Sequence, residues 1–191
     1  MGKITYIKKF RILGILIIVG LAVLWALLAL FFSRFLSPQL SYILSILVSS
    51  AFASFLVGIV GRHGLAILFY MFGALFTYGI DDLGVVGANK IIVLIIVGLV
   101  FEISLLISRM LTSPHKTAHC VVCATAISAA SIPITTGMII SSELVLGMLY
   151  PTLNMVLLAF ITGLAGGLIS ILVLLELGTT KTILRFRYLL K

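Results

Sequence analysis

A single acidic residue lies inside the apolar stretch IIVLIIVGLVFEISLLI, residues 91–107. An ionisable side chain within a membrane segment marks a candidate functional site, such as a proton relay, an ion site or a gate. Glu102 lies seven residues before Arg109, and therefore about 10 Å from that end of the segment at 1.5 Å per residue. His119 has a similar depth in the next apolar segment. We expect Glu102 to pair with His119, Arg62 or Arg109, as a structural or coupling residue rather than a substrate ligand.

The segment PHKTAHCVVC places four potential metal ligands close together. His115, His119 and Cys123 are spaced i, i+4 and i+8 and would share one helix face, whereas Cys120 lies about 100° away. Imidazole and thiolate are ligands for zinc or copper, and two cysteines near a helix start are able to act as a redox pair. One straight helix rarely supplies a tetrahedral set, and the chain has no second cysteine pair. We therefore favour ordinary packing, with a metal site as the alternative.

Polar side chains gather where several apolar segments end on one side. A few convergent polar groups in an apolar pocket are typical of a small-molecule site. Polar residues that simply line the water interface are the alternative. The candidate substrate-binding residues are Gln39, Tyr78, Asp81, Asp82, Asn89, Ser142, Glu143, Tyr150 and Asn154.

The motifs of common membrane enzymes are missing from the sequence. It contains no HExxH, no GxSxG and no GxxxxGK[ST]. Asp81 and Asp82 form an acidic pair without the further carboxylates that a magnesium-dependent phosphotransfer site needs. We expect no enzymatic activity and no cofactor, and an ATP-driven role would need an ATPase on another polypeptide.

The elements that position these residues must be membrane helices. Of 191 residues, 62% are hydrophobic and 9% are charged, with a mean hydropathy of +1.36, whereas a soluble domain has about 25% charged residues. Lipid must therefore be the solvent. A bilayer core about 30 Å thick needs about 20 apolar residues per helix. The sequence predicts one all-α transmembrane domain of six helices, the third of them short, over residues 12–32, 40–60, 65–80, 90–108, 114–141 and 151–177.

The net charge of +8 is best explained by orientation in the membrane rather than by nucleic-acid binding. Of the 13 Lys and Arg residues, only Arg34 and Lys90 fall on the side opposite the two termini. The positive-inside rule then predicts both termini in the cytoplasm of a multi-pass protein of the cell membrane. We expect the first apolar segment to be a retained helix rather than a signal peptide.

Small residues mark possible helix contacts. AVLWA places Ala22 and Ala26 one turn apart, a spacing that lets helices approach closely, either within the bundle or against another membrane protein. With six hydrophobic spans, both termini inside, a basic C-terminal tail and this AxxxA motif, the chain resembles the substrate-binding S components of energy-coupling-factor (ECF) transporters. GALFTYGIDDLGVVGANK and GLVFEISLL are similar to the region of the third and fourth helices in such proteins.

The resemblance implies a subunit that captures a micronutrient from outside the cell. The polar residues at the outer helix ends would hold the substrate, and outer connections would act as lids. The first helix, with Ala22 and Ala26 facing outward, would dock on a membrane coupling subunit driven by cytoplasmic ATPases. Two alternatives stay open, namely an accessory subunit of a larger membrane complex and a small ion-coupled carrier that uses Glu102.

Overall fold

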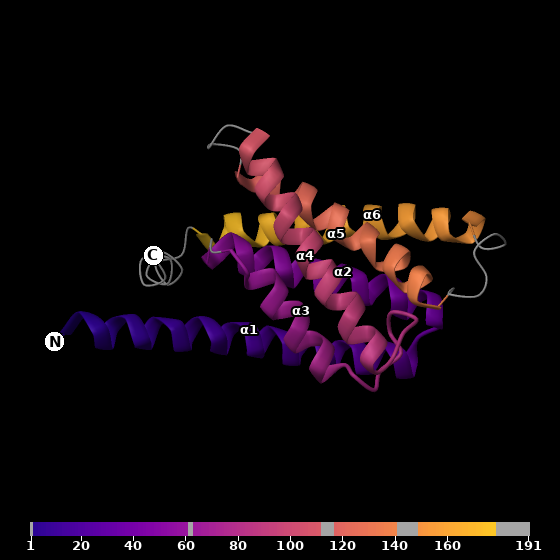
Figure 1. Ribbon diagram of the computed structural model, residues 1–191, viewed down its shortest axis with the longest axis horizontal. Helices are drawn as coiled ribbons and strands as arrows, with labels where there is room; N and C mark the ends of the chain where they lie inside the picture. Colours follow the sequence, from indigo (N-terminus) through magenta and orange to yellow (C-terminus); the bar gives the residue numbers. More distant parts are fainter. Residues whose placement is uncertain (1, 61–62, 112–116, 141–148, 179–191) are drawn as a thin grey trace.

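The computed structural model describes residues 2–60, 63–111, 117–140 and 149–178, and the regular structure in these ranges is entirely α-helical (Figure 1). The elements are α1 (Gly2–Phe35), α2 (Pro38–Val60), α3 (Leu65–Phe76), α4 (Ala88–Leu111), α5 (Thr117–Ile140) and α6 (Leu149–Gly178). The predicted all-α fold class with six helices is confirmed. Most predicted boundaries lie within a few residues of the observed ones, but α1 begins ten residues earlier than expected.

Five of the helices are long and apolar enough to cross a membrane. The exception is α3, whose 12 residues span about 18 Å at 1.5 Å per residue. The predicted segment 65–80 is therefore helical only as far as Phe76, where the Thr77 hydroxyl donates a hydrogen bond to the carbonyl of Gly73 at 2.8 Å. Residues 77–87 then form an irregular connection to α4, in which Gly84 and Gly87 have positive φ angles of 74° and 68°.

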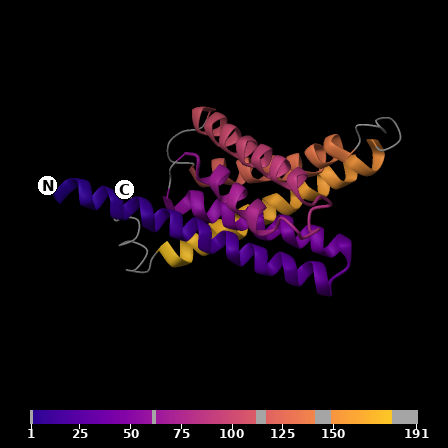
Figure 2. The same cartoon turned by 60° about the horizontal axis from the view of Figure 1, so that its bottom comes forward.

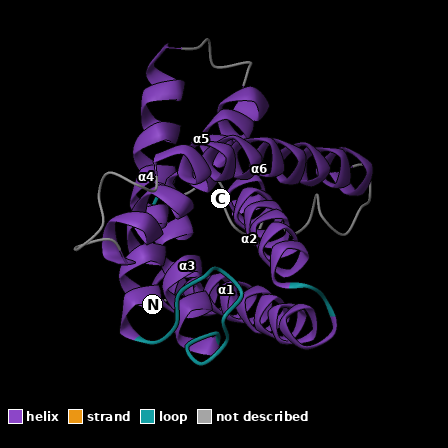
Figure 3. Ribbon diagram, turned by 90° about the vertical axis from the view of Figure 1, so that its right-hand side faces the viewer, coloured by secondary structure: helices purple, strands orange, loops and turns teal. Residues whose placement is uncertain are grey.

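The first helix lies at the edge of the bundle and packs mainly on α2 and α3. Its N-terminal part projects beyond the other helices in both views (Figures 1 and 2). The start of α1 and the end of α6 lie at one end of the bundle, whereas residues 77–87 lie at the opposite end, which faces the viewer in Figure 3. This arrangement agrees with an even number of crossings.

One face of α1 is buried against the bundle. Ile18, Ala22, Trp25 and Ala29 are almost completely buried, at the spacing of a single helix face. The expectation that Ala22 faces outward is therefore wrong, because its small side chain allows α1 to pack closely on its own neighbours. Ala26 is half-buried at the border of this face.

An aromatic cluster joins α1 to α3. The ring of Trp25 lies 5.6 Å from that of Phe69 and 6.2 Å from that of Tyr70, measured between centroids. A Cβ atom at Gly73 would overlap the Trp25 ring, so the indole packs directly on the backbone of α3. The single tryptophan of the chain is thus in contact with the shortest helix.

Candidate functional site

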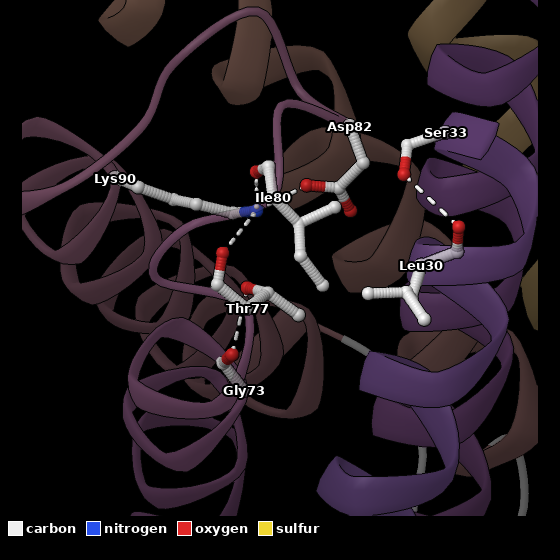
Figure 4. Close-up of polar contacts among 7 residues, drawn as sticks. All are labelled: Leu30, Ser33, Gly73, Thr77, Ile80, Asp82 and Lys90. Carbon is white, nitrogen blue, oxygen red and sulfur yellow. Dashed lines mark hydrogen bonds and ion pairs between the residues drawn. The ribbon is translucent and has the colours of Figure 1, made fainter.

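The connection between α3 and α4 is built around a buried lysine. The Lys90 ammonium donates to the carbonyl of Thr77 at 3.1 Å and to that of Ile80 at 2.8 Å, and it forms an ion pair with Asp82 (Figure 4). An ammonium group has three donors, and here each has an acceptor. The lysine therefore binds three residues of the connection, and so links the connection to the first turn of α4.

Asp82 is buried with Lys90, but only one of its carboxylate oxygens is bound. The other oxygen points away from the lysine and has no partner within the described part of the chain (Figure 4). Among the predicted substrate residues whose side chains the structure describes, Asp82 is the one that is buried, and it already serves as the counter-ion of a structural lysine.

The other predicted substrate residues do not converge on an interior pocket. Gln39, Tyr78, Asp81, Asn89 and Asn154 are exposed on the surface of the bundle. This is the arrangement expected for residues that line the interface.

The structure does not describe the side chains of three predicted substrate residues. Ser142 and Glu143 lie outside the described residues, and Tyr150 belongs to α6 but its side chain is outside the described part. Their role as substrate ligands stays a prediction.

Glu102 contacts the first turn of α3. The backbone N–H of Ala66 donates to Glu102 Oε1 at 3.1 Å, and His63 Nδ1 lies 3.8 Å from Oε2. The first N–H groups of a helix have no partner within the helix, and they carry a partial positive charge. The N-cap position is Gly64, with φ of 84° and no side chain to serve as a cap. Glu102 supplies the missing acceptor from the neighbouring helix.

The expected partner of Glu102 was therefore wrong in one respect. His119 is exposed on α5, and no ion pair joins Glu102 to His119 or Arg109 among the described residues. Arg62 lies outside the described residues. In the described part of the chain, the backbone N–H of Ala66 and the His63 ring contact the Glu102 carboxylate instead.

The potential metal ligands are dispersed. The described residues contain no group of three His, Cys, Asp or Glu side chains that could hold a metal ion, and His115 lies outside them. His119 and Cys123 are exposed, whereas Cys120 is buried and its thiol donates to the carbonyl of Ser108 at 3.4 Å. Cys120 thus takes part in packing α5 on α4.

A group of buried hydroxyls lies at the centre of the bundle. Tyr70 is fully buried, and its hydroxyl lies beside the side chains of Ser49, Ser50 and Ser128. Ser49, Tyr70 and Ser128 each occupy the middle of their own helix. We call this group the hydroxyl core, and it consists of Ser49, Ser50, Ser54, Tyr70, Thr125 and Ser128.

The hydroxyl core is only partly satisfied by internal hydrogen bonds. Ser54 and Thr125 share a bond of 2.5 Å between α2 and α5, and Ser49 donates to the carbonyl of Ile46 at 3.1 Å. Tyr70 and Ser50 have no hydrogen-bond partner among the described residues. Further buried polar atoms without such a partner belong to Trp25, Ser41, Tyr42, Ser45, Thr136 and Ser170. An unpaired buried polar group is unfavourable, so these atoms mark the place where water or a polar ligand would be stabilised.

The sequence contains a signal for the buried hydroxyls of α2. Ser41, Ser45 and Ser49 are spaced i, i+4 and i+8 in a helix that is otherwise apolar.

Glycines of α6 bring the neighbouring helices close to the hydroxyl core. A Cβ atom at Gly166 would lie 2.8 Å from the carbonyl oxygen of Leu47 and 3.0 Å from the Cβ of Ser50. A Cβ atom at Gly163 would lie 3.1 Å from the Cα of Ala126. The small residues of α6 therefore allow close packing within this bundle.

Comparison with known proteins identifies no relative. No family model matches the chain, and neither the curated proteins nor the solved structures include a significant match.

Proposed function

We propose that this protein is the membrane-embedded substrate-capture subunit of a micronutrient uptake transporter, as its resemblance to the S components of ECF transporters implies. It binds a small molecule that enters from the outer face. It docks on a membrane coupling subunit that is powered by separate cytoplasmic ATPases. The protein itself carries out no chemical reaction.

The hydroxyl core is the observation that carries this proposal. A bundle that only had to hold together would favour apolar contacts at its centre, because an unpaired hydroxyl in a dry interior is unfavourable. Here the hydroxyls of Tyr70 and Ser50 have no hydrogen-bond partner within the part of the chain that the structure describes. A polar ligand that accepts or donates hydrogen bonds would satisfy both.

The approach to this site is supported by the polar atoms on α2. Ser45 and Ser41 lie about one and two turns before Ser49, toward the end of the bundle where residues 77–87 lie. With both termini in the cytoplasm, this end is the outer one. The exposed residues Tyr78, Asp81 and Asn89 would then attract a polar solute to the entrance rather than hold it.

Docking on the coupling subunit would use a different face of α1 from the one expected. Ala22 is buried within the bundle, so it is excluded from such a contact. Because α1 packs mainly on α2 and α3, its opposite face is open, and Leu16, Leu27 and Phe31 are exposed there.

A thermal-shift screen of the detergent-purified chain tests the proposal. The compounds are water-soluble vitamins, their precursors and nucleobases. A ligand that binds only the native state, at 100 times its Kd, stabilises it by about 2.7 kcal/mol. We expect one class of compound to raise the melting temperature by several degrees, and Tyr70→Phe to remove most of that shift. Tyr78→Phe, at an exposed tyrosine, is the matched control.

Two other results would favour the alternatives. If no compound shifts the melting temperature and the chain purifies with a larger complex, it is an accessory subunit. If liposomes that contain this chain alone show a proton or ion flux that Glu102→Gln abolishes, it is a small carrier.

A further inference from the structure

The short helix α3 is contacted at both ends by charged side chains of α4. At its beginning, the N–H of Ala66 donates to Glu102. At its end, the Lys90 ammonium donates to the carbonyls of Thr77 and Ile80. Because Lys90 precedes Glu102 on α4, the two helices run in opposite directions.

The spacing of the two charges matches the length of α3. Lys90 and Glu102 are separated by 12 positions on α4, or about 18 Å at 1.5 Å per residue. The 12 residues of α3 span about the same distance. Each charged group therefore reaches one end of the same helix.

The signs of the charges also match the polarity of α3. The N-terminus of a helix carries a partial positive charge, and the C-terminus carries a partial negative charge. The carboxylate of Glu102 lies at the first and the ammonium of Lys90 at the second. Exchange of the two residues would oppose the helix at both ends.

A helix of this length needs such partners in a membrane. A bilayer core is about 30 Å thick, so an α3 of about 18 Å cannot reach water at both surfaces. Free N–H and carbonyl groups at the depth of the hydrocarbon must be satisfied by protein. Glu102 accepts from one such N–H in the first turn of α3, and Lys90 binds the carbonyl of Thr77, the residue that follows the last turn, and that of Ile80.

The packing contacts of α3 are close on two sides. A Cβ atom at Gly98 of α4 would lie 2.8 Å from the Cα of Ile67, so α3 meets a bare backbone surface there. On its other side, Gly73 presents bare backbone to the ring of Trp25. These two contacts bring α3 close to its neighbours, and the charged groups at its two ends add contacts that depend on its lengthwise position.

We propose that Glu102 and Lys90 are positioning residues that fix α3 lengthwise on α4 and thereby hold the Tyr70 hydroxyl at the level of Ser49 and Ser128. The importance of this position for a ligand rests on the proposed function. The positioning itself is a property of the free protein, so it is measured without a ligand.

Hydrogen–deuterium exchange of the detergent-purified full chain tests this role. Glu102→Gln removes the charge at the start of α3, and we expect amides of residues 65–70 to exchange about tenfold faster, as for the loss of a partly buried charge–dipole contact. The double variant Lys90→Met/Asp82→Asn removes the other charge without leaving Asp82 unpaired. It should raise exchange in residues 73–80 and leave residues 65–70 slow.

The controls separate positioning from a general loss of stability. Gly98→Ala disturbs the contact between α3 and α4 without changing a charge, and it should raise exchange along the whole of α3. Lys90→Arg keeps the positive charge, so residues 73–80 should exchange more slowly in this variant than in Lys90→Met/Asp82→Asn. If Glu102→Gln does not fold, Glu102→Asp keeps the charge with a shorter reach, and its effect must still be confined to residues 65–70.

The fluorescence of the single tryptophan gives a second measurement. Trp25 packs on Phe69 and Tyr70, so displacement of α3 should make the indole more accessible to quenching by brominated lipid. The proposal is overturned if the two charge variants leave exchange unchanged, or if both raise it uniformly along α3 as Gly98→Ala does. If the end-specific pattern is found but no compound binds, the positioning role stands and the substrate-capture function fails.

Discussion

At the scale of single residues, two buried charged side chains, those of Lys90 and Glu102, bind backbone groups. Lys90 binds two carbonyl groups, and Glu102 accepts from a backbone N–H. An intramembrane charge is a functional candidate by default, but each of these two has a partner that explains its presence. Most of the buried polar atoms without a hydrogen-bond partner among the described residues are hydroxyls, and that of Tyr70 lies at the centre of the bundle.

Tyr70→Phe should stabilise the ligand-free protein. The substitution removes a buried hydroxyl that has no hydrogen-bond partner, and relief of that penalty should raise the free energy of unfolding by about 1 kcal/mol. The measurement is the melting temperature of the variant in detergent without ligand. A lower melting temperature would mean that the hydroxyl is bonded within the protein and is not reserved for a ligand.

Asp82 and Asp81 should differ sharply although they are adjacent. Asp82→Ala leaves Lys90 buried without its counter-ion, which should cost about 3 kcal/mol of stability. Asp81→Ala affects an exposed side chain and should leave the melting temperature unchanged. Thermal unfolding of both variants checks this, and equal losses would contradict the assignment of Lys90 to Asp82.

Glu102 also illustrates which properties of a single residue can be predicted from the sequence. The depth of Glu102 followed from its distance to Arg109, because helical rise is constant. The partner of Glu102 was not predicted, because only side chains were considered as partners. A backbone N–H is present in every residue except proline, so the sequence does not single one out. The glycine before α3, Gly64, is the local sign that this helix lacks a side-chain cap of its own.

At the scale of elements, helix contacts in this bundle depend on glycine. Gly98 lies against the backbone of Ile67, and backbone atoms cannot move aside as a flexible side chain would. Apolar helices in lipid gain little from hydrophobic burial, so close packing of this kind is a main source of stability.

Gly98→Ala should therefore destabilise the protein by about 1–3 kcal/mol, because the added Cβ forces α3 and α4 apart. Gly79→Ala is the matched control, since a Cβ at Gly79 would meet no atom within 4 Å. Chemical or thermal unfolding in detergent measures both. Equal stability of the two variants would show that α3 and α4 are not in close contact.

The elements were the most predictable part of the fold. Long apolar runs bounded by polar residues gave five spans with nearly correct ends, because the thickness of the bilayer sets the length of each helix. The third helix ends at Phe76, earlier than predicted. The prediction extended to residue 80 because the segment stays largely apolar. In the structure, the Thr77 hydroxyl binds the carbonyl of Gly73, and Lys90 binds the carbonyls of Thr77 and Ile80.

At the scale of the whole molecule, the bundle has two different ends. One end carries the start of α1 and the end of α6, and the other carries residues 77–87 (Figure 1). The distribution of Lys and Arg predicts that the first end is cytoplasmic.

Cysteine labelling in intact cells tests this orientation. In a background with Cys120→Ala and Cys123→Ala, a membrane-impermeant maleimide should label Gly79→Cys without cell lysis. Arg109→Cys, at the other end of α4, should react only after lysis. The reverse pattern would place the entrance to the hydroxyl core on the cytoplasmic side and exclude capture from outside.

The most direct test of the account is a titration that follows Trp25, whose ring lies 6.2 Å from that of Tyr70. The compounds of the thermal-shift screen are added to the wild-type protein and to Tyr70→Phe while the emission of the single tryptophan is recorded. We predict a saturable change in the wild type with the stabilising compound, and loss of that change in Tyr70→Phe. A compound that stabilises both proteins equally and leaves Trp25 unchanged would place the binding site outside the hydroxyl core and contradict the account.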